Sequence, residues 1–172
     1  EDLQKLKKIG VKNLVVLSGD NQGTVDLVAR ELGLTEAHGH MLPGDKSTYI
    51  EKLKAKGHIV AFVGDGVNDS PSLALAQIGI AMGSGTDVAI ETSDVVLMNS
   101  DFSRLPHALG LAKATANNMR QNIIIAVGVV LILLASVFFS EWMNMSIGML
   151  VHEASILFVI LNGMRLLRYK LR

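Results

Sequence analysis

The sequence contains no cysteine and carries no excess of either charge. Without cysteine, the chain has no disulfide bonds, no thiolate metal ligands and no cysteine nucleophile. Its 16 basic residues balance its 16 acidic residues, and this zero net charge does not favour binding to nucleic acid. Charge is also almost lacking from residues 123–164, whereas nearly all acidic residues precede residue 102. The chain therefore divides into a polar part and an apolar part.

The polar part alternates short apolar runs with amphipathic stretches. Runs rich in β-branched residues predict strands, and apolar residues at helical spacing that stop at a glycine predict helices. The predicted strands are 11–20, 58–66, 78–83 and 94–98, and the predicted helices are 21–33, 45–57, 68–77 and 86–93. This alternation is typical of an α/β domain with a parallel sheet covered on both faces. Because ligands bind beyond the C-terminal ends of such strands, we expect chemistry in the turns after Leu17, Val63 and Met82.

The turn after Val63 has the sequence GDGVNDSP, residues 64–71, and is the most informative of the three. Asp65 leaves the strand end, Gly66 permits a backbone conformation closed to most residues, and Asp69 lies near the start of the next helix. Two carboxylates can converge there, and Mg²⁺ commonly binds one or two carboxylates together with water and phosphate oxygens. The alternative makes Asp65 a turn residue and Asp69 a helix cap. The complete eight-residue string favours the magnesium site.

The turn after the first strand carries Ser18, Gly19, Asp20 and Asn21. A hydroxyl group and free backbone N–H groups at a helix N-terminus form a natural phosphate cradle. The same tetrapeptide is also an ordinary turn and helix cap, and its position at a strand end leaves both interpretations open.

A third candidate is the segment DKST, residues 45–48. A phosphoryl-accepting aspartate is expected at the end of an apolar strand, but Asp45 follows EAHGHMLPG, which has Pro and Gly where a strand should be. We therefore predict that Asp45 is not a nucleophile but the N-cap or first-turn acid of helix 45–57. Lys46 can then extend its ammonium group toward phosphate oxygens, although a lysine on a helix surface is usually just solvated.

Together, the motifs SGDN, LPGDK and GDGVNDSP resemble the phosphorylation domain of P-type ATPases, which belong to the haloacid dehalogenase-like superfamily. The corresponding family patterns are Thr-Gly-Asp-Asn, Pro-x-Asp-Lys and Gly-Asp-Gly-x-Asn-Asp-x-Pro, in the same order. Serine replaces threonine at position 18 and keeps the hydroxyl group. The resemblance implies a haloacid dehalogenase-like Rossmannoid α/β fold.

The resemblance also implies roles for individual residues. The residues implied to contact or hold the phosphoryl group are Lys46, Ser18, Gly19 and Asp20. The residues implied at the Mg²⁺ site are Asp65, with Asp69 and Asn68 in support, and Gly66 in the same loop.

The family's nucleophile lies upstream in an Asp-Lys-Thr-Gly-Thr motif, and the ATP-binding domain is inserted after that motif. Neither occurs in this sequence, so we expect the chain to be a C-terminal fragment with the ATP pocket mostly outside it. Alone, it should not hydrolyse ATP through an aspartyl-phosphate. Its implied partners are the remainder of the same polypeptide, namely the actuator domain, the nucleotide-binding domain and further membrane helices.

The apolar part contains two candidate membrane spans that form a hairpin. Residues 123–139 carry no charge and, with their flanks, approach the roughly 20 residues that cross a bilayer. A second apolar stretch, 145–164, follows a short link, 140–144, in which Trp142 suits a membrane interface. The alternative is a buried helical pair of a soluble protein, which the length and purity of the first span disfavour.

Basic residues flank both spans on the same side. Those before the first span are Lys113 and Arg120, and those after the second are Arg165, Arg168, Lys170 and Arg172. The positive-inside rule therefore predicts that both ends of the hairpin, and the phosphate-handling domain, lie in the cytoplasm.

His152 and Glu153 lie near the centre of the second span. Ionisable groups at that depth are expensive and usually face a protein interior, a pathway or each other. Imidazole and carboxylate suit a borderline divalent transition metal, and Ser155 is a further candidate ligand. In the alternative, the pair makes hydrogen bonds to neighbouring helices or relays protons.

The segments RQNIII and LNGMRLLR resemble the last two membrane helices of heavy-metal-transporting P-type ATPases. The Tyr-Asn and Met-x-x-Ser-Ser patterns of copper pumps, and the membrane lysine and Asp-x-Gly of zinc, cadmium and lead exporters, are absent. The segment HEAS most resembles the His-Glu-Gly-Gly/Ser-Thr/Ser motif of the cobalt and iron exporters, with Ala154 in place of a glycine.

The resulting hypothesis is an ATP-driven exporter of divalent ions such as Co²⁺, Fe²⁺ or Zn²⁺, integral to the bacterial plasma membrane. Residues 1–103 would be part of the phosphorylation domain, 104–122 a connecting helix that transmits its changes, and 123–172 the membrane hairpin with a basic tail. Two alternatives stay open. One is a membrane-anchored phosphatase of the same superfamily, and the other is a truncated metal-binding or regulatory membrane partner.

Overall fold

The computed structural model describes residues 1–65, 67–83, 86–98, 101–139 and 144–170. Three of the residues singled out from the sequence lie outside these ranges, namely Gly66, Trp142 and Arg172. Of the predicted link 140–144, only Asn144 is described. The chain forms two compact units, Glu1–Pro106 and His107–Arg172.

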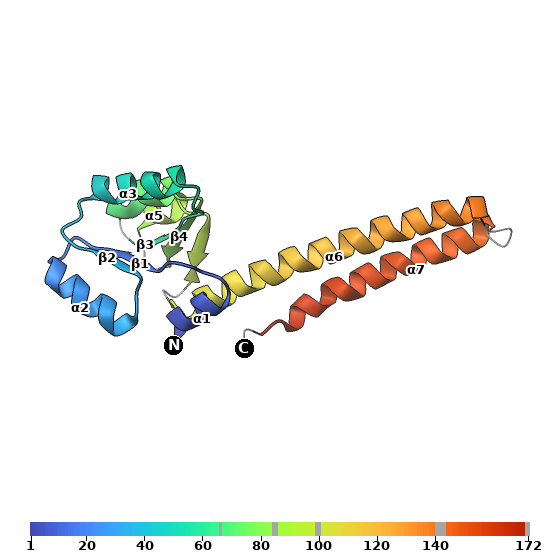
Figure 1. Cartoon of the computed structure of the whole chain (residues 1–172), viewed down its shortest axis with the longest axis horizontal. Coiled ribbons are helices and arrows are strands. Elements are labelled where there is room, and N and C mark those ends of the chain that lie inside the picture. Colours follow the sequence, from blue (N-terminus) through green and yellow to red (C-terminus); the bar gives the residue numbers. More distant parts are fainter. Residues whose placement is uncertain (66, 84–85, 99–100, 140–143, 171–172) are drawn as a thin grey trace. The chain divides into compact units, whose positions relative to one another are not determined.

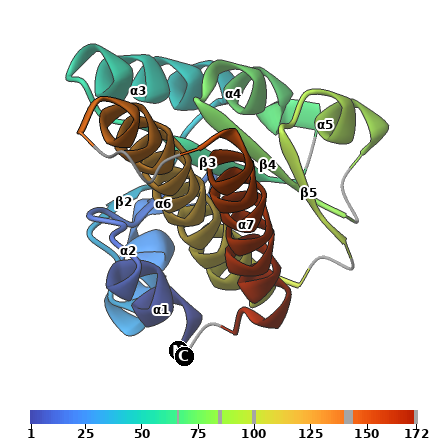
Figure 2. The same cartoon turned by 90° about the vertical axis from the view of Figure 1, so that its right-hand side faces the viewer.

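The first unit alternates helices with parallel strands (Figure 1). In chain order its elements are α1 (Asp2–Lys8), β1 (Val15–Leu17), α2 (Gln22–Leu32), β2 (Glu36–His38), α3 (Pro43–Ala55), β3 (Ala61–Gly64), the 3₁₀ turn η1 (Val67–Asp69), α4 (Ser70–Leu75), β4 (Ile78–Met82), α5 (Asp87–Glu91) and β5 (Val95–Leu97). Helices α3, α4 and α5 lie on one side of the strands, and α1 and α2 lie on the other (Figures 1 and 2). The predicted α/β class is therefore confirmed.

The prediction of a single parallel sheet is wrong for the described residues. β1 pairs in parallel with β2, and β3, β4 and β5 form a separate parallel sheet in that order. No ladder joins the two sheets in the described parts of the chain, so neither β1 nor β3 has a second strand partner there. Alternation of strands and helices predicts parallel pairing, but it does not say which edges are joined.

The central strand β4 carries the core of the three-stranded sheet. Its residues Ile80 and Ala81 point to opposite faces, yet they are only 1% and 0% exposed. Ile50 from α3 and Leu73 from α4 are each 1% exposed. Both faces of the sheet are therefore covered, as predicted.

Strand β2 was not predicted, because Gly39, Pro43 and Gly44 mark the segment as a loop. The strand is only three residues long and is defined by its register against β1, in which Val16 pairs with Ala37. Helix α3 begins at Pro43, two residues earlier than predicted, since proline at a first helical position has no N–H group that needs a partner. Asp45 is a first-turn acid, as predicted, and its carboxylate accepts a hydrogen bond from the backbone N–H of Leu42 at 3.0 Å.

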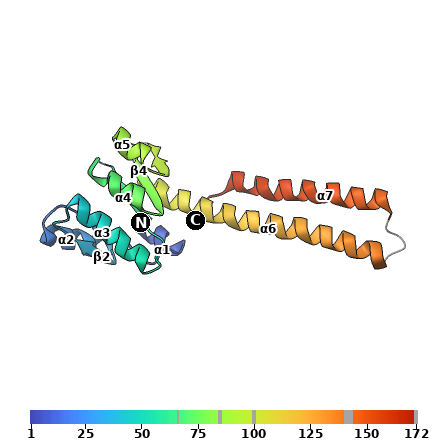
Figure 3. The same cartoon turned by 90° about the horizontal axis from the view of Figure 1, so that it is seen from above.

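The second unit is built on two long helices, α6 (Arg104–Phe139) and α7 (Met145–Met164), followed by the 3₁₀ turn η3 (Arg165–Arg168). Helix α7 has the predicted bounds, and α6 runs as one helix through the predicted connecting segment and the first span. Both are long and apolar enough to cross a membrane, by length and composition. They lie side by side (Figures 1 and 3).

Three asparagines link these two helices. The side chain of Asn118 is 4% exposed and donates to the backbone carbonyl of Asn162 at 2.8 Å. Asn162 in turn donates to the side chain of Asn122 at 2.8 Å, and Asn122 donates to Asn118 at 3.1 Å. This closed set of amide hydrogen bonds fixes the register between α6 and α7 at one end.

Candidate functional site

Lys46 and Asp69 form an ion pair between two of the predicted motifs. Lys46 lies in the first turn of α3, and Asp69 ends η1 beyond the C-terminal end of β3. Lys46 Nζ lies 2.8 Å from Asp69 Oδ1, and the two side chains are only 16% and 14% exposed. Because the pair is largely shielded from water, its charge-assisted hydrogen bond is stronger than an exposed one. Lys46 is therefore not a solvated surface lysine.

Asp69 occupies the helix-cap position that the alternative interpretation predicts, but its side chain does not act as a cap. Asp69 is the N-cap residue of α4, yet its side chain makes no capping hydrogen bond and goes to Lys46 instead. Gly64 makes room for it: a Cβ at Gly64 would lie 2.7 Å from Asp69 Cβ and 3.0 Å from its Oδ2. The sequence motif points to Gly66 as the special glycine of this loop, and the role of Gly64 cannot be recognised without the position of Asp69.

Contacts between α3 and α4 hold this pair in place. Ser47 Oγ lies 3.3 Å from Ser72 Oγ, and Lys54 donates to the backbone carbonyl of Leu75. Ser72 is fully buried. The helix that carries Lys46 is therefore packed directly on the helix that Asp69 begins.

Asp65 and Asn68 are exposed at the same strand end. The backbone carbonyl of Asp65 accepts a hydrogen bond from Thr86 N at 3.2 Å, which ties the β3 turn to the start of α5. Within the described residues, neither side chain has a hydrogen-bond or ion-pair partner. The Asp65 carboxylate is thus available to a ligand. Gly66 lies outside the described residues.

Ser18 and Asp20 contact each other in the turn after β1. Ser18 Oγ donates to Asp20 Oδ2 at 2.8 Å and accepts from Asp20 N at 3.2 Å. Asn21 is the N-cap of α2, and its side chain accepts from Gly23 N at 2.8 Å. The turn-and-cap interpretation is thus confirmed, and the phosphate cradle stays a prediction. The space around Gly19 does not itself require glycine, because an added Cβ would lie 3.6 Å from its nearest neighbour, Met41 O.

The loop after β2 is fixed against the turn after β1. Met41 N donates to Ser18 O at 2.9 Å, and His40 N donates to Asp20 O at 2.7 Å. A Cβ at Gly39 would lie only 2.7 Å from the Cα of Gln22, so the close approach of the two segments requires glycine. The sequence analysis missed this role of Gly39, because it depends on pairing between β1 and β2.

The structure therefore places the predicted residues in two groups. Lys46 contacts Asp69, and Ser18 contacts Asp20. In the described parts of the chain, no hydrogen bond or ion pair joins one group to the other. Both groups lie beyond the C-terminal ends of parallel strands, where an α/β fold binds its ligands.

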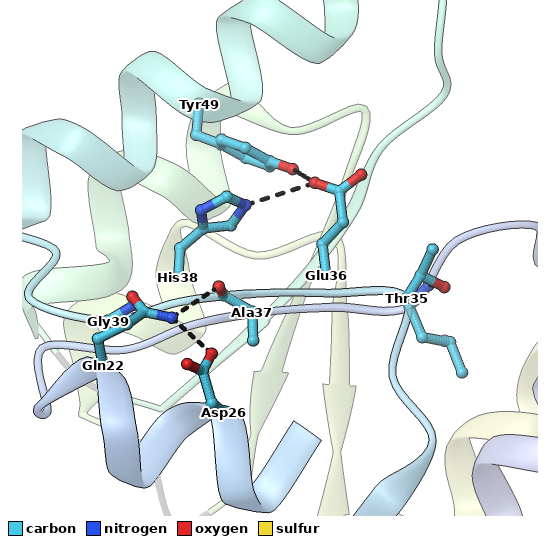
Figure 4. Close-up of polar contacts among 9 residues, drawn as sticks. Gln22, Asp26, Thr35, Glu36, Ala37, His38, Gly39 and Tyr49 are labelled. Atoms are coloured by element: carbon cyan, nitrogen blue, oxygen red, sulfur yellow. Dashed lines mark hydrogen bonds and ion pairs between the residues drawn. The ribbon is translucent and has the colours of Figure 1, made fainter. Parts of the chain in front are cut away.

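A separate open pocket of about 480 Å³ lies between α2 and β2 and contains none of the predicted site residues. Glu36 lines this pocket, and Tyr49 and His38, which do not, are both directed at its carboxylate (Figure 4). The Tyr49 hydroxyl donates to Glu36 Oε2 at 2.6 Å, and His38 Nε2 lies 3.4 Å from the same oxygen. The bond from Tyr49, with His38 second, lowers the pKa of Glu36. Burial, then the bond to Glu36, raises the pKa of Tyr49 to about 12.

In the second unit, His152 and Glu153 lie in the middle of α7, as predicted, and both are exposed in this chain. Adjacent residues of an α-helix point about 100° apart, so the two side chains face different directions. Ser155 Oγ donates to the backbone carbonyl of His152 at 2.6 Å. The described residues contain no group of three or more His, Cys, Asp or Glu side chains that would hold a metal ion.

Comparisons with known proteins agree with this architecture. Two families of haloacid dehalogenase-like hydrolases match residues 3–77 and 46–109. The cadmium-transporting ATPase of Staphylococcus aureus is 41% identical over 98% of this chain and 23% of its own length. The zinc-transporting ATPase of Bacillus subtilis is 39% identical over 98% of this chain and 26% of its own length. The silver-exporting P-type ATPase of Salmonella typhimurium is 49% identical over 72% of this chain and 15% of its own length.

Among solved structures, a zinc-transporting PIB-type ATPase in an E2·Pi state aligns with a TM-score of 0.85 and 39% identity, over 97% of this chain and 27% of that one. The chain spans about a quarter of the length of the cadmium- and zinc-transporting relatives. The match covers both units of the chain. The chain therefore belongs to the heavy-metal P-type ATPases and corresponds to their C-terminal region. It contains part of a haloacid dehalogenase-like phosphorylation domain, followed by two long apolar helices.

Proposed function

We propose that this chain is the C-terminal part of an ATP-driven exporter of divalent transition metals, which forms an aspartyl-phosphate on a residue outside the chain. The observation that carries the proposal is the shielded pair of Lys46 and Asp69, 2.8 Å apart at the C-terminal end of β3. It joins two phosphate-handling motifs in a chain homologous to metal-transporting ATPases over nearly its whole length.

In this proposal, Lys46 stabilises the negative charge of the phosphoryl group as it is transferred. A preorganised cation that is shielded from water stabilises developing charge far better than a solvated one. Asp69 holds the ammonium group in place through its Oδ1. Ser18, Gly19 and Asp20 would hold the phosphoryl oxygens in the same step, with the Ser18 hydroxyl turning from Asp20 Oδ2, its acceptor in this structure, to a phosphoryl oxygen.

The donors at the end of β3 fit Mg²⁺, since this ion takes one or two carboxylates and completes its shell with water and phosphate oxygens. The exposed carboxylate of Asp65 and the remaining oxygen of Asp69 would hold it, and Asn68 and the Gly66 loop would support them. When bound, Mg²⁺ would neutralise charge on the phosphoryl group. ATP itself would bind mostly outside this chain.

The two separate sheets favour completion by another part of the parent polypeptide. A two-stranded sheet such as β1–β2 is marginal alone, and its free edges present unpaired N–H and C=O groups. We propose that a strand from the remainder of the same polypeptide pairs with these edges. The actuator domain, the nucleotide-binding domain and other membrane helices would be the further partners.

In the membrane, His152 and Glu153 would contribute to the transport site. An ionisable group in the middle of a 20-residue apolar helix needs a partner, because burial in hydrocarbon without one is costly. The two side chains point in different directions, so we propose that at least one of them binds the metal. Ser155 is a further candidate, because its hydroxyl donates its proton to the His152 carbonyl and keeps its oxygen lone pairs for a metal. Further ligands would come from other helices of the parent.

The metal is a divalent ion in this proposal. The cadmium and zinc relatives match over 98% of the chain, whereas the silver relative matches over 72%. These names favour Zn²⁺ or Cd²⁺, and they do not support the cobalt and iron subgroup. The HEAS segment keeps Co²⁺ and Fe²⁺ among the ions to be tested.

We place the parent in a bacterial plasma membrane, with both ends of the hairpin in the cytoplasm. The basic residues on one side of the two spans support this orientation. The continuous helix α6 contains residues of both units, which gives phosphorylation a mechanical route to the membrane. Equal protease sensitivity of α6 in the phosphorylated and free parent would contradict that route.

The test is ATP hydrolysis by the purified full-length parent with Zn²⁺, Cd²⁺, Co²⁺, Fe²⁺ or Cu⁺. We expect one divalent metal to stimulate the wild type, and at least one of His152→Ala and Glu153→Gln to abolish the response. Phosphorylation by inorganic phosphate should survive in both variants. The control is Leu157→Ala, at an exposed residue of the same helix that carries no ligand atom, and it should keep the response.

Two other outcomes have distinct meanings. If both variants respond like the wild type, His152 and Glu153 are structural, and the metal-site proposal fails while the pump proposal stands. If no metal stimulates ATP hydrolysis and the parent instead hydrolyses small phosphate esters, the membrane-anchored phosphatase replaces the pump.

A further inference from the structure

A second pocket, of about 450 Å³, lies between α6 and the turn η3 that follows α7. On the α6 side it is lined by Ala114, Asn117, Asn118 and Gln121. These residues follow the i, i+3, i+4, i+7 spacing of a single helix face. On the other side it is lined by Arg165, Leu166 and Arg168 of η3 and by the two residues after it, Tyr169 and Lys170.

The 3₁₀ conformation of η3 gathers positive charge on this pocket. In a 3₁₀ helix, side chains three positions apart lie directly above one another, so Arg165 and Arg168 project on the same side. Lys170 lines the pocket as well. In the part of the chain that the structure describes, none of these three cations has an ion-pair partner. The nearest acidic residue along the described chain is Glu153, twelve positions before Arg165.

Neutral groups in the pocket are oriented to donate hydrogen bonds. Arg165 Nη2 donates to Gln121 Oε1 at 3.2 Å, which leaves the amide NH₂ of Gln121 as a donor. The ring of Tyr169 packs against His107, with ring centroids 5.5 Å apart, and this contact holds the chain after η3 against α6. The pocket therefore combines guanidinium, ammonium, amide and phenol donors and contains no carboxylate.

The pocket also lies at the depth of lipid headgroups, provided that the hairpin spans the bilayer as proposed above. The uncharged run of α6 begins at Ile123, so Asn117 and Gln121 lie about 3–9 Å before it along the helix axis. The headgroup zone on each side of a bilayer is roughly 5–8 Å thick. Basic pockets between membrane helices on the cytoplasmic side bind anionic headgroups.

We propose that this pocket binds the phosphate headgroup of an anionic phospholipid of the leaflet in which η3 lies. Arginine recognises phosphate oxygens through two parallel N–H donors, a geometry that Arg165 and Arg168 can supply. Phosphatidylcholine carries a phosphate together with a quaternary ammonium group, so its headgroup has no net charge and the basic pocket would attract it less. The proposal goes beyond metal transport, because it concerns how the lipid composition acts on the hairpin.

The experiment uses the full-length parent in a non-ionic detergent, to which phosphatidylglycerol or phosphatidylcholine with identical acyl chains is added. Native mass spectrometry then counts the lipids that remain bound. We expect phosphatidylglycerol to be retained in preference, and Arg168→Gln to weaken this binding about tenfold, since a direct hydrogen bond to a charged phosphate contributes at least about that factor. The matched control is Arg120→Gln, which removes one positive charge from the same end of α6 outside the pocket and should change binding less than about twofold.

Three outcomes would overturn the proposal. Equal retention of both lipids would remove the selectivity, and equal losses in the two variants would mean diffuse attraction rather than a pocket. Displacement of phosphatidylglycerol by equimolar inorganic phosphate would mean that the site recognises free phosphate and not a lipid. Protease treatment of sealed membrane vesicles separates these failures from failure of the span itself. Cleavage of the parent within residues 123–139 or 145–164 would show that the hairpin does not cross the bilayer, whatever its ATPase activity.

Discussion

The ammonium group of Lys46 lies 2.8 Å from Oδ1 of Asp69, although the two residues are 23 positions apart in the sequence. Lys46 comes from the helix after β2, and Asp69 from the turn after β3. Neither motif alone indicates that its charged residue is neutralised by the other. The contact brings two separate sequence motifs together at one place in the fold.

Lys46→Gln should abolish most phosphoryl transfer in the parent. Loss of a preorganised donor to a transition-state anion typically lowers the turnover rate by about 100-fold or more. The Asp69 carboxylate, 14% exposed, would also lose its partner. This loss should lower the free energy of unfolding by about 1–3 kcal/mol. Phosphoenzyme formation from labelled ATP measures the first effect, and urea denaturation measures the second.

The matched control for this prediction is Lys52→Gln, at an exposed lysine on the same helix α3. It removes one positive charge from the same helix and should leave both phosphoenzyme formation and the free energy of unfolding nearly unchanged. Similar effects of the two substitutions would show that helix charge, and not the pair with Asp69, matters.

Gly64→Ala should disrupt the same site without changing any charge. The new Cβ would lie 2.7 Å from Asp69 Cβ, so either the β3 end or Asp69 must move. Overpacking of this kind costs about 1–3 kcal/mol, and the shift of Asp69 should reduce phosphoenzyme formation. The control is Gly44→Ala in the first turn of α3, where an added Cβ meets nothing within 4 Å. Wild-type phosphorylation in Gly64→Ala would mean that the contact is not needed for the site geometry.

Tyr49 should make the stability of the protein depend on alkaline pH. Burial, with the bond to Glu36 second, raises its pKa from 10.0 to about 12. Between these values the unfolded chain loses the phenolic proton while the folded chain keeps it. The contribution of Tyr49 is therefore complete below pH 10.0 and is lost as the pH rises toward about 12.

Denaturation of wild type and Tyr49→Phe over this pH range measures that contribution. Phenylalanine has no proton to lose, so the variant should show a smaller fall in stability with rising pH. Parallel curves for the two proteins would exclude a titrating Tyr49.

Asn118→Leu should loosen the hairpin. The substitution removes the hydrogen bonds to Asn162 and Asn122 and leaves the Asn162 carbonyl without this donor. Polar contacts between membrane helices contribute about 0.6–2 kcal/mol. Denaturation of the full-length protein in mixed detergent micelles measures the loss. Asn117→Leu, at the exposed neighbouring position, is the control and should have little effect.

Several elements follow from local sequence signals, and these were predicted with the correct type. Asn21 and Gly33 mark the two ends of α2, because asparagine caps an N-terminus and glycine adopts the left-handed conformation, here with φ of 66°. The long, mostly apolar stretch predicts α7 from Met145 to Met164. Such signals require only residues that are near one another along the chain.

The elements that were missed or misjudged depend on distant residues. β2 is a strand because it pairs with β1, and its own three residues carry no strand signal. The division into two sheets could not be predicted either, since alternation does not specify which strands share hydrogen bonds.

The sequence by itself determined the residue types at the candidate sites, the order of the motifs and the two apolar spans. Only the tertiary structure decided that Lys46 bonds to Asp69, that Gly64 makes room for Asp69, and that Arg165 and Arg168 line one pocket with Gln121. The physical reason is that residue type and spacing act locally. A salt bridge, a close backbone approach and a pocket require segments far apart in the sequence to meet, and the packing of helices and strands fixes which ones do.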